Sequence, residues 1–150
     1  MIREAMAKDF DSLMQLYTQL HDNPMPPQTE ATTALWQNIL ADKDHHIIVA
    51  ELDGKIVSSC VCVVIPNLTH RQQPYALIEN VVTDKAYRKQ GLATACLEFA
   101  KTIALQENCY KIMLLTGAKD EQTLNFYRRA GYNSNDKTAF IQWLPHVESV

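Results

Sequence analysis

The residue types best suited to chemistry lie in residues 88–93, which have the sequence RKQGLA and lead into an amphipathic run that ends near Asn108. The start of a helix exposes about four unpaired backbone N–H groups and a partial positive charge, so it attracts anions. Gly91 and Ala93 keep the turn bare for a phosphate group, and Arg88 and Lys89 add positive charge. The segment therefore favours diphosphate binding, although a capped helix after a solvated basic turn has the same features.

Other cofactor motifs are missing from the chain. It has neither the GxxxxGK[ST] motif of P-loop proteins nor the GxGxxG motif of dinucleotide-binding folds. The four cysteines, Cys60, Cys62, Cys96 and Cys109, form no CxxC pair, and with the histidines at 45 and 46 they match no zinc module. We therefore predict no metal site and expect these thiols to be small, buried side chains of a cytoplasmic protein.

The overall composition is that of an ordinary globular domain. The chain has 150 residues, a net charge of −3, 47% hydrophobic and 21% charged residues, which excludes a disordered chain and favours one domain over residues 1–150. Its longest apolar run, Cys60–Ile65, is much shorter than the roughly 18 residues of a membrane span. The slightly acidic charge disfavours nucleic acid as a partner. We therefore expect neither a membrane nor a nucleic acid to be its partner.

The elements that must position the basic turn are a strand before it, expected at 75–83, and a helix after it, expected at 91–108. Asp53-Gly54 predicts a tight hairpin, and Asp9 is a candidate helix cap. The other expected strands are 2–5, 46–52, 55–65, 111–115 and 138–144, and the other helices are 9–21, 29–42 and 120–130. Strands adjoin mid-chain and alternate with helices later, so the fold class is α+β, or α/β with a mixed sheet.

Two blocks of the chain resemble those of the GNAT superfamily of acyl-CoA-dependent N-acetyltransferases. Arg88–Ala93 resembles its R/Q-x-x-G-x-G/A motif, and residues 123–132, TLNFYRRAGY, resemble its A-x-x-F-Y-x-x-x-G-F block. The chain departs from the family at Lys85, where proline is common, and at Thr123, where alanine is usual. The resemblance implies a GNAT-like fold, with a central mixed sheet of six to seven strands, splayed between strands 4 and 5 and flanked by about four helices.

The resemblance also implies that acetyl-CoA is the cosubstrate. The end of the fourth strand would hold the pantetheine arm, and the turn and helix start would hold the diphosphate. By position, the cofactor-binding residues are Val81, Val82, Thr83, Arg88, Lys89, Gln90, Gly91, Leu92, Ala93 and Thr94. Asp120 stands where some family members have asparagine, and its negative charge speaks against a contact with the cofactor.

The implied reaction is direct attack of a neutral primary amine on the thioester within a ternary complex. Because an ammonium group has a pKa of about 10, a base or a water path must remove its proton. Glu79 is the candidate base, since an apolar surrounding would strengthen its carboxylate as a base, although a solvent-facing or arginine-paired glutamate fits the same pattern. Tyr127 aligns with the family's tyrosine beside the CoA sulfur and is the candidate acid, with core packing as the alternative.

The acceptor is expected to be a small-molecule amine. Ile78–Val82 and Asn108–Ile112 look like the matching stretches of glucosamine-phosphate N-acetyltransferases, which carry aspartate where Asn80 stands, so an amino-sugar phosphate is one candidate acceptor. The loop residues His21, Asp22, Asn23, His70 and Arg71 are expected to border the acceptor site, although each is also typical of an ordinary loop. A non-catalytic acyl-CoA-binding module remains the alternative function.

The last apolar segment has two interpretations. Phe140, Ile141, Trp143 and Leu144 could join two copies in a homodimer, as C-terminal strands do in some family members, or could close the sheet of one copy. The sequence does not separate these possibilities.

Overall fold

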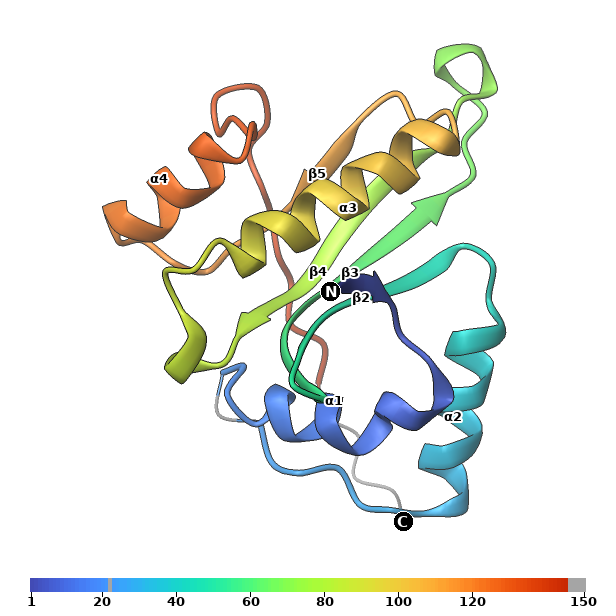
Figure 1. The fold of residues 1–150 in the computed structure, drawn as a ribbon. Coiled ribbons are helices and arrows are strands. Elements are labelled where there is room, and N and C mark those ends of the chain that lie inside the picture. The colour runs from blue at the N-terminus through green and yellow to red at the C-terminus, as the bar shows by residue number, and fades with distance from the viewer. Residues whose placement is uncertain (22, 146–150) are drawn as a thin grey trace. The chain divides into compact units, whose positions relative to one another are not determined.

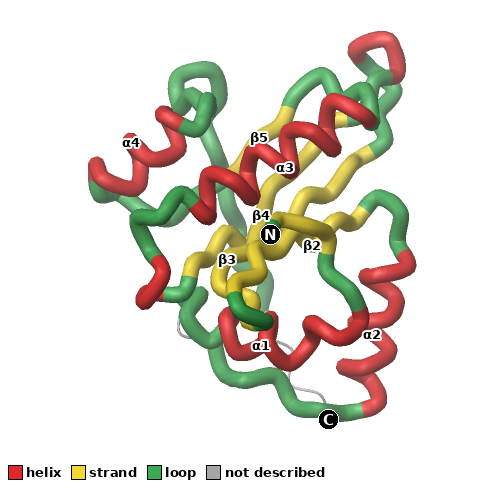
Figure 2. Tube along the Cα trace, in the orientation of Figure 1, coloured by secondary structure: helices red, strands yellow, loops and turns green. Residues whose placement is uncertain are grey.

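The computed structural model describes residues 1–21 and 23–145 and divides into two compact units, Met1–Leu114 and Leu115–Val150. The first unit contains a five-stranded sheet in the order β1-β2-β3-β4-β5, shown in yellow in Figure 2. Its strands are β1 (Ile2–Glu4), β2 (His45–Leu52), β3 (Lys55–Ile65), β4 (Tyr75–Thr83) and β5 (Ile112–Leu114). Neighbouring strands are antiparallel except for the parallel pair β4 and β5. The fold is therefore mixed α+β, as predicted.

Four α-helices accompany the sheet in the described residues, in agreement with the expected number. The first unit contains α1 (Phe10–Tyr17), α2 (Glu30–Ala41) and α3 (Leu92–Gln106), and the second contains α4 (Glu121–Arg129). Short 3₁₀ turns are η1 (Ala7–Asp9), η2 (His70–Gln72) and η3 (Lys85–Tyr87). Within the first unit, α1 and α2 contact β2, β3 and β4, and α3 also packs along the sheet (Figure 1).

The two faces of the sheet carry different apolar side chains, because successive residues of a strand point to opposite faces. The cluster beneath α1 and α2 consists of Leu13, Met14, Leu16, Trp36, Ile47, Val49, Ile56, Val61 and Val82. On the other face, Cys60 lies near Cys96 of α3, and both are fully buried. This confirms the expectation that the cysteines at 60 and 96 are core residues.

Local sequence signals locate most elements correctly. β3 and β4 have the predicted bounds, and Thr29 caps α2 by accepting a hydrogen bond from the Thr32 N–H at 3.1 Å. In the predicted hairpin, Asp53 and Gly54 have φ angles of 50° and 77°, the left-handed pair that such a turn needs. α1 is shorter than predicted, since it ends at Tyr17 rather than near His21.

The expected sheet of six to seven strands is wrong, because the described residues form five. Residues 138–144, predicted as a strand, form none. Their large apolar side chains are exposed, with Phe140 at 90% and Trp143 at 85%. An apolar run forms a strand only where a partner strand can pair with its backbone N–H and C=O groups. The tertiary structure decides whether such a partner is present.

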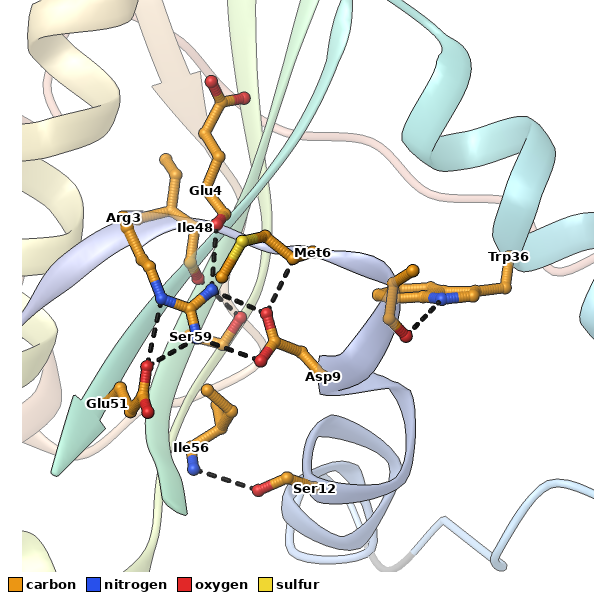
Figure 3. Close-up of polar contacts among 11 residues, drawn as sticks. Arg3, Glu4, Met6, Asp9, Ser12, Trp36, Ile48, Glu51, Ile56 and Ser59 are labelled. Atoms are coloured by element: carbon orange, nitrogen blue, oxygen red, sulfur yellow. Dashed lines mark hydrogen bonds and ion pairs between the residues drawn. The ribbon is translucent and has the colours of Figure 1, made fainter. Parts of the chain in front are cut away.

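A largely buried ion-pair network joins β1 to the start of α1 and to β2 (Figure 3). The Arg3 guanidinium donates to both Asp9 oxygens, at 2.6 and 2.9 Å, and to Glu51 Oε2 at 2.6 Å. Asp9 precedes α1 as predicted, but it makes no side-chain cap there; it accepts instead from the Met6 N–H at 2.7 Å. The Arg3 hydrogen bonds hold the pKa of Asp9 below its ordinary value. The network thus fixes where α1 begins on the sheet.

Candidate active site

The predicted diphosphate-binding turn lies between β4 and α3. Gly91, with φ 78°, precedes the first residue of α3, and no side chain caps the helix. Lys89 is also left-handed, with φ 63°. Left-handed residues next to a helix start turn several backbone N–H groups outward, which is the geometry of an anion-binding concavity. Because α3 is 15 residues long, its start also has the partial positive charge of a full helix dipole.

The ten predicted cofactor-binding residues lie in two stretches, residues 81–83 at the end of β4 and residues 88–94 in the basic turn and the start of α3. Val82 is buried and Val81 and Thr83 are half-buried. The exposed members are Arg88, Lys89, Gln90, Gly91 and Thr94, while Leu92 and Ala93 are half-buried. The Arg88 side chain donates from Nε to the Thr83 carbonyl at 3.3 Å, which links the basic turn to the strand.

The turn is anchored by residues that the sequence did not single out. The buried Asp84 carboxylate accepts from the Ala86 N–H at 2.9 Å and from Lys55 Nζ at 2.9 Å, and these bonds hold the pKa of Asp84 below its ordinary value. The Lys85 N–H donates to Gln19 Oε1 at 2.9 Å. An aspartate just before a short helical turn is a capping signal that could have identified Asp84. No local signal identifies Gln19, which comes from 66 residues earlier in the chain.

The last part of β4 has no partner strand on one side within the Met1–Leu114 unit. The parallel ladder joins Ala76–Ile78 to Ile112–Leu114 and ends there, whereas β4 continues to Thr83. Backbone groups of residues 79–83 on that side can therefore pair with an extended ligand, as an added strand would.

A β-bulge interrupts β4 beside this open edge. Val61 pairs with Glu79 and Ser59 pairs with Val82, so Cys60 stands opposite two residues, Asn80 and Val81. Asn80 is left-handed, with φ 52°, a conformation that asparagine tolerates better than most residues. The bulge changes the alternation, so that Glu79 and Val82 lie on the same face of the sheet.

The environment of Glu79 differs from the expected one. Its side chain is exposed rather than buried among apolar residues, which fits the alternative of a solvent-facing glutamate. Its carboxylate makes no ion pair within the described part of the chain, so the alternative of an arginine-paired glutamate is also absent there. The carboxylate is thus open to an approaching group.

Tyr127 belongs to α4 in the second unit. Its ring is half-buried and meets the rings of Phe126 and Tyr132 edge-on, with centroids 5.0 and 6.5 Å away. Asp120 caps α4 by accepting from the Thr123 N–H at 2.9 Å and from Thr123 Oγ1 at 2.8 Å. Asp120 therefore has a structural role at the start of α4, which explains an acid at this position.

The structure places His70 and Arg71, which were expected to border the acceptor site, away from the basic turn. They lie in η2, before β4, where Ile65 pairs with Tyr75, at the opposite end of β4 from Thr83. The sequence placed them in a loop correctly, but strand direction decides which end of the sheet that loop occupies. Asp22 lies outside the described residues.

Three of the four thiols, those of Cys60, Cys62 and Cys96, are buried, whereas that of Cys109 is half-buried. Burial raises the pKa of Cys62 to about 12 and that of Cys96 to about 11, so both are protonated at neutral pH. No group of three or more histidine, cysteine or acidic side chains is arranged for a metal ion in residues 1–21 and 23–145. No helix in the same residues is long and apolar enough to cross a membrane.

Comparison with known proteins decides the family. A family model described as "Acetyltransferase (GNAT) family" matches residues 10–132, which include the bulged strand, the turn and α4. The chain belongs to the GNAT acetyltransferase family. Both blocks quoted above, residues 88–93 and 123–132, lie within the matched range.

Relatives within the GNAT family include enzymes and solved structures. The chain is 31% identical over 84 residues to the glucosamine 6-phosphate N-acetyltransferase of Trypanosoma brucei brucei, a match covering 56% of this chain and 55% of that protein. A solved structure of a proposed acetyltransferase from Agrobacterium tumefaciens strain C58 is 36% identical, with a TM-score of 0.87 over 95% of this chain and 99% of that one. Glucosamine-6-phosphate N-acetyltransferase from Arabidopsis thaliana has the same fold, with a TM-score of 0.84, 23% identity, and coverage of 97% and 98%.

Proposed function

We propose that this GNAT protein is an acetyl-CoA-dependent N-acetyltransferase, in which residues 1–150 form a single acetyltransferase domain and the acetyl group passes directly to a primary amine in a ternary complex. The observation that supports it most is the junction of β4 and α3. An uncapped helix start with left-handed Lys89 and Gly91 follows directly on a strand whose last residues have an open edge. A long ligand with an extended amide arm and a diphosphate fits such a junction.

The residues divide the work of holding acetyl-CoA, which supplies the acetyl thioester. The backbone of Val81–Thr83 would pair with the amide arm, and the N–H groups from Arg88 to Thr94 would bind the diphosphate. A backbone N–H near Val82 would also donate to the thioester carbonyl. One donor of this kind contributes about 10²–10³ in rate where it has been measured.

Glu79 and Tyr127 would manage the protons. The exposed carboxylate of Glu79 would accept the proton of the incoming ammonium group, directly or through water. The Tyr127 hydroxyl would donate a proton to the leaving sulfur. The buried, protonated thiols of Cys62 and Cys96 support direct transfer, since neither is suited to form a covalent acyl intermediate.

We propose an amino-sugar phosphate as the first acceptor class to test. Its support is the likeness to the Trypanosoma brucei brucei enzyme, whose name states that it acetylates glucosamine 6-phosphate. The chain spans about half of that relative's length, so the acceptor is a proposal for this chain.

The first test is thermal unfolding with acetyl-CoA, free CoA or NAD. A ligand at 100 times its dissociation constant adds about 2.7 kcal/mol of stability, which shifts the unfolding midpoint visibly. We expect a shift with acetyl-CoA and CoA and none with NAD. If neither acetyl-CoA nor free CoA shifts the unfolding midpoint, the proposed function is contradicted.

The second test follows CoA thiol release with glucosamine 6-phosphate as the acceptor. Glu79→Gln and Tyr127→Phe are each expected to lower turnover by about 10²-fold or more while leaving CoA binding intact. Tyr75→Phe is the matched control, since Tyr75 lies at the opposite end of β4. CoA binding without release for a panel of small amines would favour the non-catalytic module instead.

We further propose that the protein is cytoplasmic and forms a homodimer through residues 138–144. The exposed side chains of Phe140, Ile141, Trp143 and Leu144 support the second point, because water-facing apolar groups of this size are commonly covered by a partner. Light scattering coupled to size-exclusion chromatography tests it. A dimer that becomes a monomer on Trp143→Glu supports the proposal, and a monomeric wild-type chain contradicts it.

A further inference from the structure

The short turn η3 lies between the end of β4 and the basic turn at residues 88–91. A single 3₁₀ turn is held by few hydrogen bonds of its own, and their geometry is poorer than in an α-helix. The first two residues of η3 are exposed and its last residue is half-buried, so burial does not fix it either. The position of η3 therefore depends on directed contacts from other parts of the chain.

The side chain of Lys55 contacts both ends of η3. Lys55 Nζ donates to Asp84 Oδ2 at 2.9 Å, and the other oxygen of this carboxylate accepts from the Ala86 N–H at 2.9 Å. Nζ also lies 5.4 Å from the centre of the Tyr87 ring, which is within the range of a cation–π contact. The Tyr87 N–H in turn donates to the Asp84 carbonyl at 2.8 Å. Lys55 thus closes a ring of contacts around η3.

Lys55 reaches η3 from a firmly held part of the sheet, since it is the first residue of β3. The next residue, Ile56, is 2% exposed, and its N–H donates to the Ser12 hydroxyl of α1 at 2.9 Å. One residue further, the Val57 carbonyl accepts from the Asp84 N–H at 2.8 Å. The backbone that carries Lys55 is therefore fixed to both α1 and the end of β4.

The charges of this ion pair are unequally exposed. The Asp84 side chain is 9% exposed and that of Lys55 is 51% exposed. A carboxylate withdrawn from water is costly unless a counter-charge and hydrogen bonds satisfy it. Lys55 supplies that counter-charge, so its ammonium group is engaged within the protein. Its influence on a bound phosphate is therefore expected to pass through η3 rather than through direct contact.

We propose that Lys55 is a positioning residue of the candidate active site: through its contacts with Asp84 and η3, it fixes the backbone N–H groups of residues 89–91 before α3. The last residue of η3 is joined directly to Arg88, whose Nε donates back to the Thr83 carbonyl at 3.3 Å. The structural part of this inference stands on the protein without ligand. Its consequence for CoA binding rests on the proposed function.

The first experiment uses NMR of the protein without ligand. Lys55→Met keeps an apolar stem without the charge, and it is expected to shift the N–H signals of residues 89–91, whereas Lys55→Arg should keep them near their wild-type positions. Lys43→Met is the matched control, because Lys43 Nζ also lies 2.9 Å from a carboxylate, that of Asp44, before β2. Unchanged signals of residues 89–91 in Lys55→Met would overturn the inference, whatever the protein binds.

The second experiment measures CoA affinity by titration. Lys55→Met is expected to weaken CoA binding about fivefold, the upper range for one partly exposed ion pair. Lys55→Arg should recover most of the affinity, and Lys43→Met should leave it unchanged. In the Asp84→Asn background the ion pair is already absent, so Lys55→Met should cause almost no further loss.

The remaining outcomes separate this role from two simpler ones. Additive losses in the double variant would mean that Lys55 acts on CoA independently of Asp84, which overturns the positioning role. A lower thermal unfolding midpoint with unchanged CoA affinity would reduce the pair to an ordinary stabilising contact and overturn it as well. A wild-type protein that binds no CoA would contradict the proposed function alone, since the NMR experiment still decides what Lys55 does to residues 89–91.

Discussion

The two ends of β4 have the same strand backbone but different surroundings. At the first end, Ala76–Ile78 pair with β3 on one side and β5 on the other, and the strand alternates regularly. At the last end, residues 79–83 have one paired side, and the bulge at Asn80 breaks the alternation. The first end is held by apolar burial, whereas the last end also has directed polar contacts with β3, such as the 2.8 Å hydrogen bond between the Ser58 and Thr83 hydroxyls.

This difference shows how one strand can serve two purposes. Full pairing and burial fix the sheet and leave no backbone group for a ligand. Where pairing stops, backbone groups become available, but the strand then needs other contacts to keep its shape. Gln19 and Asp84 supply such contacts around the open end. Substitutions at the two ends should therefore separate stability from CoA binding.

The largest effect on stability is expected at the paired end. Ile78→Ala removes a side chain that is 1% exposed, and it should lower the free energy of unfolding by about 3 kcal/mol. The affinity for CoA should not change, because the open end is intact. Urea denaturation and CoA titration measure the two quantities. Leu68→Ala, at an 86%-exposed residue, is the control, and a loss under about 1 kcal/mol for Ile78→Ala would contradict the comparison.

Gly91→Ala should affect both quantities at the open end. Its φ of 78° strains any side chain, although a Cβ there meets nothing within 4 Å, so we expect a stability loss of about 1 kcal/mol. Affinity for CoA should fall about tenfold as the anion-binding turn changes shape. Gly54→Ala, with φ of 77° and equally free space, is a close match in the hairpin. Equal CoA affinities of Gly91→Ala and Gly54→Ala would show that the turn at Gly91 does not bind CoA.

The pH dependence of stability should distinguish Asp84. The Ala86 N–H and then Lys55 hold its pKa below the ordinary 3.8, so its contribution is present above pH 3.8 and is lost as pH falls through the lowered pKa. Asp84→Asn should cost about 1 kcal/mol at pH 6, and the difference from wild type should shrink in acid below pH 3.8. Urea titrations at both pH values measure this. A difference that grows on acidification would reverse the assigned direction.

The smallest effect is expected in η2, beyond the paired end. His70 stacks on Tyr110 at 3.9 Å between ring centroids and is left-handed, with φ of 51°. His70→Gly loses the stack but relieves the strained backbone, so stability should change by less than about 0.5 kcal/mol. CoA affinity should be unchanged. A clear loss of CoA affinity would place η2 at the site after all and remove the distinction between the two ends.

The sequence predicted those features that follow from neighbouring residues. The turn at residues 88–91 and the start of α3 follow from glycine, basic residues and a helical stripe, and the hairpin follows from Asp53-Gly54. The exposure of Glu79 did not follow, because an apolar run before it says nothing of what covers its side chain. The predicted strand at 138–144 failed for a related reason, since a strand requires a partner that distant residues must provide.

By itself, the amino-acid sequence determined the family resemblance, the order of most elements and the glycine turn before α3, since all of these depend on spacing along the chain. Only the tertiary structure decided that Gln19 anchors Lys85 and that His70 lies at the far end of β4. The physical reason is that these contacts join residues far apart in sequence. Strand direction, register and the bulge bring them together, and none of these three is visible in a local pattern.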